Sequence, residues 1–197
     1  MTANAHELRE SVRRAYSAAA DVPDAKHPFP VGAAFACDIG YPQELLRRLP
    51  EEAVEAFAGV SSVSVRAPLS DGLVVIDLGC GAGLDSLVAA ERVGPTGRVV
   101  GIDFSDSMLE RACRSAKRGG YPRLGFVRAS AEQLPLRDSS VDVALVNGIF
   151  NLNPFRDDIF HELARVVRPG GRVSGAELIL GAPLPEHLKF GTSNWFS

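Results

Sequence analysis

The sequence lacks the features that mark several large classes of protein. It has only three cysteines, Cys37, Cys80 and Cys113, which are too few and too scattered for a disulfide framework. No run of apolar residues approaches the roughly 18 that a membrane-spanning helix needs, and the first residues lack the build of a signal peptide. These absences predict a soluble, cytoplasmic protein without a membrane partner.

A strong excess of one charge is also missing. The chain has 21 basic and 24 acidic residues, mixed along its length, and no basic arm or acidic tail. We therefore expect no nucleic-acid partner. At 197 residues and 46% hydrophobic composition, the chain is long and apolar enough for one domain with a buried core.

The first seventy residues differ in composition from the rest. They hold only 3 of the 19 glycines but 6 of the 13 prolines. Apolar residues at steps of three and four, such as Leu8, Val12 and Tyr16, predict a helix over residues 4–20. Prolines then predict an irregular segment over 21–37, since proline fixes φ and removes a donor. Two short helices are expected at 42–48 and 50–58.

From Gly72 onward, predicted strands alternate with predicted helices. The strands are expected at 73–76, 98–104, 124–128, 141–146 and 172–180. The helices are expected at 84–93, 106–118 and 155–167. Ser107 and Glu110 have the spacing of a capping box, and Pro169 with two glycines should end the last helix. This order predicts an α/β fold with a mostly parallel, Rossmann-like sheet and right-handed crossovers.

A glycine-rich loop follows the first predicted strand. Residues 77–83 read Asp-Leu-Gly-Cys-Gly-Ala-Gly and lead into a helix, which is where nucleotide-binding loops occur. A tight turn without a ligand is the alternative, although fewer glycines would suffice for it. A dinucleotide-binding loop needs a further glycine where this chain has Leu84. Asp77 would repel a pyrophosphate but attract a sulfonium and an ammonium group, so the loop favours S-adenosylmethionine over NAD.

An acid also follows the second predicted strand. Asp103 can accept hydrogen bonds from both hydroxyls of a ribose, which is common to both cofactor classes. The competing interpretation is a solvated acid that caps the next helix. Asp103 therefore supports a nucleoside without choosing between the cofactors.

Several motifs together resemble the class I S-adenosylmethionine-dependent methyltransferases. They are the loop at 77–83, the segments 101–109 and 130–136, and the runs 140–147 and 163–171. The resemblance implies that the acid and glycine loop holds the methionine part, that Asp103 holds the ribose, and that Met108 or Phe104 lies on the adenine. It further implies that Ala131 and Glu132 flank the adenine edge. The implied cofactor residues are Tyr16, Asp77, Gly79, Cys80, Gly81, Gly83, Asp103, Phe104, Met108, Ala131, Glu132 and Asn147.

Asn147 ends the fourth predicted strand, and the resemblance places it at the methyl-transfer site, as the candidate catalytic residue. Tyr16 has core packing as its alternative role.

Within this superfamily the chain looks most like the arsenite methyltransferase group. The shared segments include 40–46, 49–54, 92–97 and 146–154. That group binds trivalent arsenic through three thiolates, which suit a soft centre. At two of the implied thiol positions this chain has Val60 and Gly148, and the third would lie one residue past Ser197. Of the cysteines present, only Cys37 could line the acceptor site, and a small buried hydrophobe is the alternative for it.

We therefore interpret the chain as a methyltransferase that acts on another acceptor, a small molecule, by in-line transfer. A true arsenite methyltransferase and a non-catalytic S-adenosylmethionine-binding module stay open, and an NAD-linked oxidoreductase is a weaker fourth reading. The oligomeric state is not readable from the sequence.

The acceptor side is expected to come from residues 1–70, a helical cap folded over a cofactor-binding core at 71–197 as one structural unit. His27 could act as a base or be an exposed loop residue, and the asparagines could instead cap the helix near Phe155. The candidate lining residues are Tyr16, His27, Phe29, Phe35, Asn147, Phe150, Asn151 and Asn153. The family normally adds an antiparallel hairpin after the fifth strand. We expect that hairpin to be missing here, with an exposed sheet edge in its place.

Overall fold

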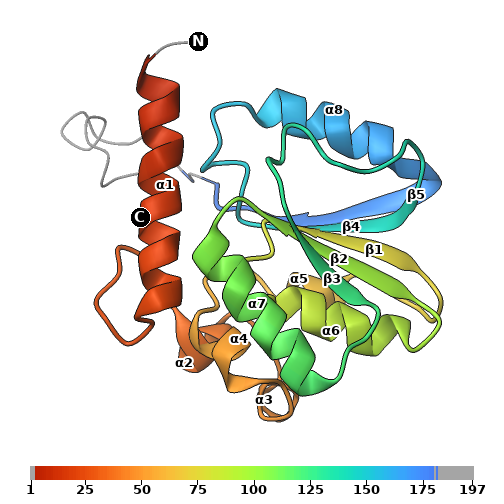
Figure 1. Cartoon of the computed structure of the whole chain (residues 1–197), viewed down its shortest axis with the longest axis horizontal. Coiled ribbons are helices and arrows are strands. Elements are labelled where there is room, and N and C mark those ends of the chain that lie inside the picture. Colours follow the sequence, from red (N-terminus) through yellow and green to blue (C-terminus); the bar gives the residue numbers. More distant parts are fainter. Residues whose placement is uncertain (1–2, 180, 182–197) are drawn as a thin grey trace.

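A parallel sheet forms the centre of the protein. The structure, a computed structural model, describes residues 3–179 and 181. Five strands lie in the order β3-β2-β1-β4-β5, and each neighbouring pair is parallel (Figure 1). The strands are β1 (Val74–Leu78), β2 (Arg98–Asp103), β3 (Leu124–Arg128), β4 (Val141–Asn147) and β5 (Val167–Ala176). The predicted α/β fold with a Rossmann-like sheet is confirmed.

Helices cover both faces of this sheet. Helix α8 lies on one face, α5, α6 and α7 lie on the other, and α1 stands beside the sheet (Figure 1). The helices are α1 (Ala3–Asp21), α2 (Gly32–Asp38), α3 (Gln43–Leu46), α4 (Glu51–Glu55), α5 (Val63–Arg66), α6 (Leu84–Val93), α7 (Asp106–Gly119) and α8 (Arg156–Val166). No helix in the described part of the chain is long and apolar enough to cross a bilayer.

The register of the central strands brings three polar strand ends together. Asp77 pairs with Gly101 on one side and with Leu145 on the other. Because the strands are parallel, Asp77 in β1 and the last residues of β2 and β4, Asp103 and Asn147, meet at the same edge of the sheet. The apolar residues between them are buried, so this edge has a fixed shape.

Helix α1 covers that edge through its apolar face. Ala19 and Ala20 form a small buried cluster with Ala82 of the glycine loop and Met108 of α7. The hydroxyl groups of Ser17 and Ser105 lie 2.9 Å apart in a hydrogen bond, which also fixes α1 against the start of α7. The helix predicted over residues 4–20 is thus confirmed, and its apolar face lies against the cofactor loop.

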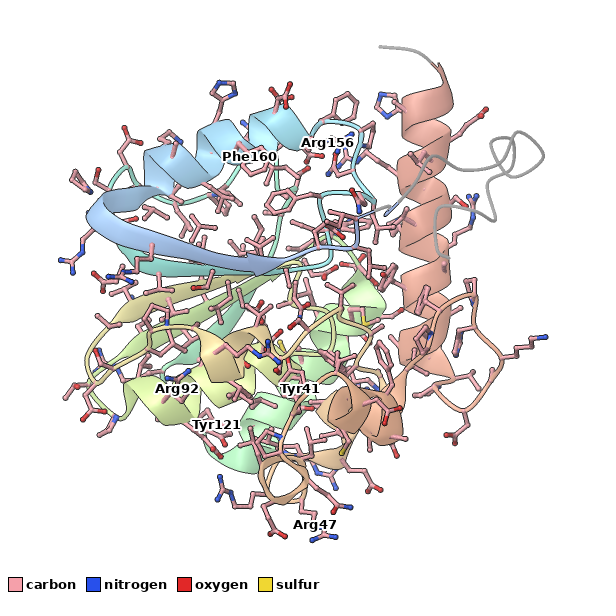
Figure 2. All side chains as sticks on the ribbon, turned by 180° about the vertical axis from the view of Figure 1, so that it is seen from behind. Tyr41, Arg47, Arg92, Tyr121, Arg156 and Phe160 are labelled. Carbon is pink, nitrogen blue, oxygen red and sulfur yellow. The ribbon has the colours of Figure 1, made fainter. Side chains whose placement is uncertain are left out.

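One arginine of α6 fastens the rest of the N-terminal segment to the core. The guanidinium of Arg92 donates to the carbonyls of Ser64, Val65 and Ala67 at 2.6, 3.0 and 2.8 Å (Figure 2). These carbonyls belong to α5 and the residue after it. Serine and β-branched valine favour helices weakly, so the sequence of α5 gave no helical signal and the helix was not predicted. Its carbonyls gain a donor only when the chain folds.

The prediction of an irregular segment over residues 21–37 is wrong in part. After Pro30, the alanine-rich stretch Gly32–Asp38 forms α2, because no proline remains to block it. The two short helices exist but are shorter than predicted, as α3 and α4.

Two predictions near helix ends are also corrected. The cap of α7 is Ser105, whose hydroxyl accepts from the Met108 N–H at 3.4 Å, so the box of Ser107 and Glu110 does not form. Strand β5 begins at Val167 and runs through Pro169, where the pairing with β4 is irregular, because this edge strand can tolerate the missing donor. It ends at Ala176, and the expected loss of a hairpin concerns residues 182–197, which lie outside the described residues.

Candidate functional site

A cleft opens at the carboxyl ends of β1, β2 and β4, and α1 forms part of its wall. The space between its walls, the open mouth included, is about 1050 Å³. Every predicted cofactor residue except Gly83 lines it: Tyr16, Asp77, Gly79, Cys80, Gly81, Asp103, Phe104, Met108, Ala131, Glu132 and Asn147. The fold therefore gathers residues that are more than a hundred positions apart.

The glycine loop has a backbone shape that only glycine allows at its first position. Gly79 has φ +75°, and a Cβ there would lie 2.3 Å from Cγ2 of Ile149. The N–H groups of Gly79 and Cys80 both donate to the carbonyl of Ile102, at 2.8 and 3.0 Å. The loop is thus fixed to β2. Ile149, two residues after the end of β4, packs directly onto the backbone of the loop.

Gly83 has a packing role at the end of the same loop. It precedes α6 with φ +90°, and a Cβ there would lie 3.1 Å from Ala112 and 3.2 Å from the ring of Phe126. The missing side chain lets α7 and β3 approach the start of α6. Gly83 does not line the cleft, so its predicted contact with a cofactor has no support from the geometry.

Asp103 is buried and joins two loops. One carboxylate oxygen accepts from the N–H of Gly81 at 2.9 Å, and the other accepts from the N–H of Ser105 at 2.9 Å. Burial raises the pKa of Asp103, and the backbone N–H donors oppose that shift. A carboxylate has about four acceptor positions, and the backbone N–H groups of Gly81, Phe104 and Ser105 act on Asp103, so one position remains for a further donor. Asp103 is only 8% exposed, which excludes the solvated cap considered above.

Asp77 is a buried carboxyl group at the glycine-loop end of the cleft. It is 1% exposed, and the Ser86 hydroxyl donates to it at 2.6 Å. Burial, and then the nearby Asp85, raises the pKa of Asp77 well above its ordinary value. Among the described residues, four carboxyl groups line the cleft, those of Asp77, Asp85, Asp103 and Glu132, together with one guanidinium, that of Arg9. Such a cleft favours a cationic ligand and disfavours a pyrophosphate.

Helix α1 reaches across the opposite rim of the cleft. The guanidinium of Arg9 donates to the Ser130 hydroxyl at 2.9 Å and lies 3.5 Å from the Glu132 carboxylate. Tyr16 lines the cleft and also stacks on Phe29 with ring centres 4.4 Å apart, which confirms its packing role, while its contact with a cofactor stays a prediction. Burial raises the pKa of Tyr16, and its phenol is therefore a donor and no base at neutral pH.

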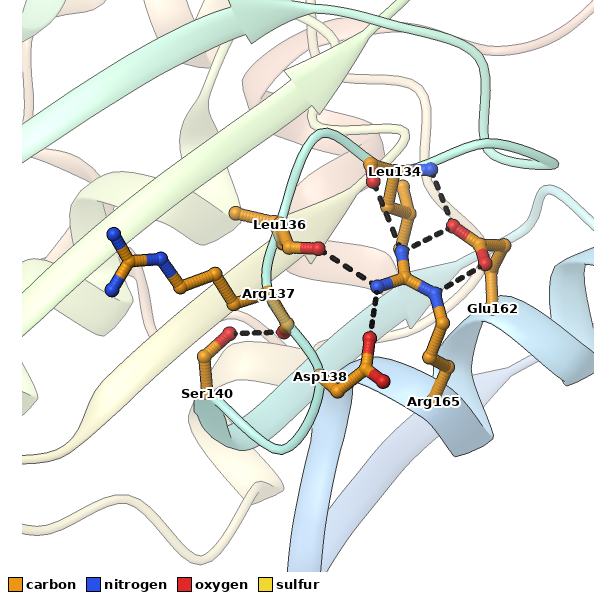
Figure 3. A network of polar contacts seen from close by, with 7 residues as sticks. All are labelled: Leu134, Leu136, Arg137, Asp138, Ser140, Glu162 and Arg165. Carbon is orange, nitrogen blue, oxygen red and sulfur yellow. Dashed lines mark hydrogen bonds and ion pairs between the residues drawn. The ribbon is translucent and has the colours of Figure 1, made fainter.

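Arg165 of α8 fixes the segment that carries Ala131 and Glu132, through hydrogen bonds to the residues that follow them (Figure 3). Its guanidinium donates to the carbonyls of Leu134 and Leu136 at 3.0 and 2.8 Å. It also pairs with the carboxylate of Glu162, which accepts from the Leu134 N–H at 2.6 Å. These bonds explain why an arginine lies within the run 163–171, since they hold the loop after β3 against the cleft.

Asn147 lines the cleft, but its amide group is occupied within the protein. Its carbonyl oxygen accepts from the N–H groups of Val60 and Ser61 at 2.9 and 3.2 Å. Its amide nitrogen donates to the carbonyl of Ser61 and to the carboxylate of Asp85, both at 2.8 Å. A catalytic role for Asn147 stays a prediction, and these contacts give its side chain the task of holding the segment at residues 60–61.

The predicted acceptor residues are only partly brought together. Tyr16, Asn147 and Asn153 line the cleft. Asn153 also accepts from the Phe155 N–H at 2.8 Å, but Phe155 is itself the N-cap residue of α8 and no side chain caps that helix, so the alternative capping role is not confirmed. The other predicted residues, His27, Phe29, Phe35, Phe150 and Asn151, are not among the lining residues. Their aromatic rings pack on other side chains: His27 on Phe29, Phe35 on Phe57, and Phe150 on Phe160.

The two implied thiol positions that lie within the described residues are neighbours in space. A Cβ at Gly148 would lie 2.9 Å from Cγ1 of Val60. Positions 60 and 148, at which the resemblance implies thiols, are therefore adjacent in space, although neither residue carries a thiol here. Of the cysteines, only Cys80 lines the cleft, while Cys37 and Cys113 do not.

Sequence reasoning missed two charged residues of the cleft. Arg9 lies one turn before Val12 on the predicted helix, so the helical spacing could have indicated it. Asp85 lies two residues after the last loop glycine, and its position in the first turn of α6 is the only signal that it gives. The short side chains of Ala53, Ala56 and Gly59 also line the cleft, and no local pattern marks them.

Comparison with known proteins agrees with this geometry. A family model described as a methyltransferase domain matches residues 69–195. An arsenite methyltransferase of Halobacterium salinarum is 34% identical over 131 residues, which are 66% of this chain and 34% of that protein. A demethylmenaquinone methyltransferase of Lactococcus lactis subsp. lactis is 37% identical over 102 residues, which are 52% of this chain and 40% of that protein.

Among solved structures, an arsenic (III) S-adenosylmethionine methyltransferase of Chlamydomonas reinhardtii, CrArsM, is similar with a TM-score of 0.60 and 30% identity. The match covers 81% of this chain and 53% of that one, and the chain spans between about a third and about a half of the length of these relatives. The family model and the cleft lead to the same assignment. The chain belongs to the class I S-adenosylmethionine-dependent methyltransferase family, close to its arsenite methyltransferase-like members.

Proposed function

We propose that the protein transfers a methyl group from S-adenosylmethionine to a small-molecule acceptor in the cleft beneath α1. The observation that carries this proposal is the pairing of the glycine loop with an excess of buried acids at the same edge of the sheet. Asp77 and Asp85 lie at the methionine end, where a sulfonium and an ammonium group would gain from negative charge. The proposal includes action in the cytoplasm, and neither nucleic acid nor a membrane as partner.

Each wall of the cleft has a part in holding the cofactor under this proposal. The loop at residues 79–81 would accommodate the methionine part, and Asp103 would accept from the ribose through its remaining acceptor position. Met108 and Phe104 offer apolar surface to the adenine, and Ala131 and Glu132 would flank its edge. Tyr16 and Arg9 would cover the cofactor from α1. Gly83 supports this site through packing alone.

When bound, the cofactor supplies a methyl group that is attached to a positively charged sulfur. The rest of the cofactor leaves as a neutral thioether when the methyl group is transferred. The residues of this chain contribute alignment and exclusion of water, which are the main terms in such a displacement. No histidine or lysine lines the cleft in the described part of the chain. The four carboxyl groups are therefore the candidate bases for an acceptor that has to lose a proton.

We further propose that residues 1–70 act as the cap on the acceptor side and that residues 71–197 act as the cofactor core. The cap already contributes Ala53, Ala56 and Gly59 to the wall of the cleft. The acceptor would approach the cofactor along the wall that these small residues form. The relatives named above make arsenite and a demethylmenaquinone reasonable first acceptors, but Val60 and Gly148 offer arsenite no thiolate.

Calorimetry with S-adenosylmethionine, S-adenosylhomocysteine and NAD tests the cofactor assignment. We expect micromolar or tighter binding of the first two and none of NAD; tight binding of NAD alone would contradict the reading of the loop. An acceptor screen that includes arsenite then follows S-adenosylhomocysteine formation. Turnover with arsenite that survives replacement of all three cysteines would exclude a thiolate site. Tight cofactor binding without turnover across the panel would indicate a binding module.

A further inference from the structure

Asp85 is a buried carboxylate that the family resemblance left without a role. It lies in the first turn of α6, directly after the glycine loop, and it lines the cleft while only 5% exposed. In the described part of the chain it has no ion-pair partner. Its charge is offset by hydrogen bonds and by the N-terminal end of α6.

Three donors meet at this carboxylate from three separate parts of the chain. The Tyr41 hydroxyl donates to one oxygen at 2.5 Å, and the Ser64 N–H donates to the same oxygen at 3.0 Å. The amide of Asn147 donates to the other oxygen at 2.8 Å. Tyr41 belongs to the N-terminal segment, Ser64 to α5 and Asn147 to β4, so Asp85 joins the cap to the sheet.

The segment that these bonds hold is the part of the cap nearest the cofactor. Asn147, itself held by Asp85, accepts from the N–H groups of Val60 and Ser61. A Cβ at Gly59 would lie 2.5 Å from the Asn147 amide nitrogen, so the backbone of residue 59 rests directly on this side chain. Residues 59–64 are thus fixed at both ends by one network that is centred on Asp85.

We propose that Asp85 is a positioning residue that couples the cofactor loop to residues 59–64 of the acceptor wall. A ligand that contacts the glycine loop also restrains the first turn of α6, which carries Asp85. Because Asp85 accepts from the Ser64 N–H, the restraint extends to Ser64. It extends to residues 60 and 61 through Asn147. This inference rests on the proposed function and adds a specific residue to it. A shape-matched apolar residue would pack as well at this position, but it would not restrain three backbone N–H groups.

Hydrogen–deuterium exchange of the amides at residues 58–65, with and without saturating S-adenosylmethionine, tests the coupling without any acceptor. In the wild type we expect the cofactor to slow exchange of the Val60, Ser61 and Ser64 amides by at least about tenfold. In Asp85→Ala, which also removes one acid of the cleft, we expect weaker cofactor binding, and at saturating cofactor we expect these amides to be slowed by less than about twofold. Exchange in β1 and β2 should stay as in the wild type.

Arg92→Met is the matched control. Arg92 holds the carbonyls of Ser64, Val65 and Ala67 but does not line the cleft. This variant should loosen the far end of the same segment and keep the cofactor-dependent slowing at residues 60 and 61. If Asp85→Ala does not fold, Tyr41→Phe, which removes one donor from Asp85, should show at least about a threefold loss of the slowing.

The outcomes separate the two proposals. Wild-type slowing in Asp85→Ala or in Tyr41→Phe, or a wild type that binds the cofactor without any slowing, overturns the coupling alone. If Asp85→Ala does not bind the cofactor at the highest concentration tested, Tyr41→Phe, which changes no residue of the cleft, decides the coupling in its place. A wild type that does not bind S-adenosylmethionine overturns the proposed function, and the coupling with it.

Discussion

The two sides of the cleft are held together by different kinds of bond. On the cofactor side, the N–H groups of Gly79 and Cys80 donate to the backbone carbonyl of Ile102, and the N–H of Gly81 donates to the Asp103 carboxylate. On the acceptor side, residues 1–70 are held mainly by side chains, among them Arg9, Arg92 and Asn147. A wall made by backbone bonds tolerates change in surrounding side chains, whereas a wall made by side-chain bonds can be altered by single substitutions. This difference allows one cofactor core to serve many acceptors.

The largest loss of stability and cofactor affinity is expected from a substitution that disturbs the backbone of the cofactor side. Gly79→Ala would place a Cβ 2.3 Å from Ile149 at a residue with φ +75°. We expect the free energy of unfolding to fall by about 2–4 kcal/mol, from strain and overpacking together. S-adenosylmethionine affinity should fall about 100-fold, because the loop moves relative to Asp103. Urea unfolding and calorimetry measure the two effects.

Gly120→Ala is the control for that substitution. Gly120 has φ +72° but nothing within 4 Å of an added Cβ, so only the strain remains. It should cost about 1 kcal/mol and leave cofactor affinity unchanged. Equal effects of the two substitutions would show that contact with Ile149 does not shape the loop.

The next largest effect should come from the carboxylate that joins the two cofactor loops. Asp103→Ala should weaken S-adenosylmethionine binding by about 10- to 100-fold, or about 1–3 kcal/mol, through lost hydrogen bonds. Asp142→Ala is the control, because Asp142 accepts from the Val74 N–H at 2.6 Å at the other end of β4 and does not line the cleft. That variant should lose stability but keep its affinity. An unchanged affinity of Asp103→Ala would leave Asp103 with a helix-capping role alone.

The same division explains what the sequence could predict. The motif residues of the cofactor side were found because a strand, a glycine loop and a helix follow one another locally, and α6 and β3 have the predicted bounds. Helix α5 and the contact of Val60 with Asn147 were missed because they depend on partners that are distant in the sequence. His27 and Phe35 were predicted as lining residues from their position in the cap. Their rings are instead used in aromatic packing.

The pH dependence of the free energy of unfolding tests the contribution of Asp77, the buried acid on the cofactor side. Burial raises the pKa of Asp77 in the folded state above its ordinary value of 3.8. The stability that its protonated form contributes is therefore complete at low pH and is lost as the pH rises through the folded-state pKa. Asp77→Asn keeps an acceptor for Ser86 but does not titrate. The wild type should thus lose stability relative to this variant as the pH rises above about 4, and an equal pH dependence of the two free energies of unfolding in urea would contradict the buried-acid assignment.

The smallest expected effect concerns the contact between α1 and the core across the mouth of the cleft. Arg9→Met removes the contacts with Ser130 and Glu132, at 2.9 and 3.5 Å. Because this pair is only partly buried, we expect S-adenosylmethionine affinity to fall by about two- to fivefold, or less than about 1 kcal/mol. Arg13→Met on the same helix is the matched control, since Arg13 pairs only with Glu10, one turn away and exposed, among the described residues. Its effect on affinity should be within error. An increase in affinity in Arg9→Met would mean that α1 hinders access to the cleft instead of holding the cofactor in it.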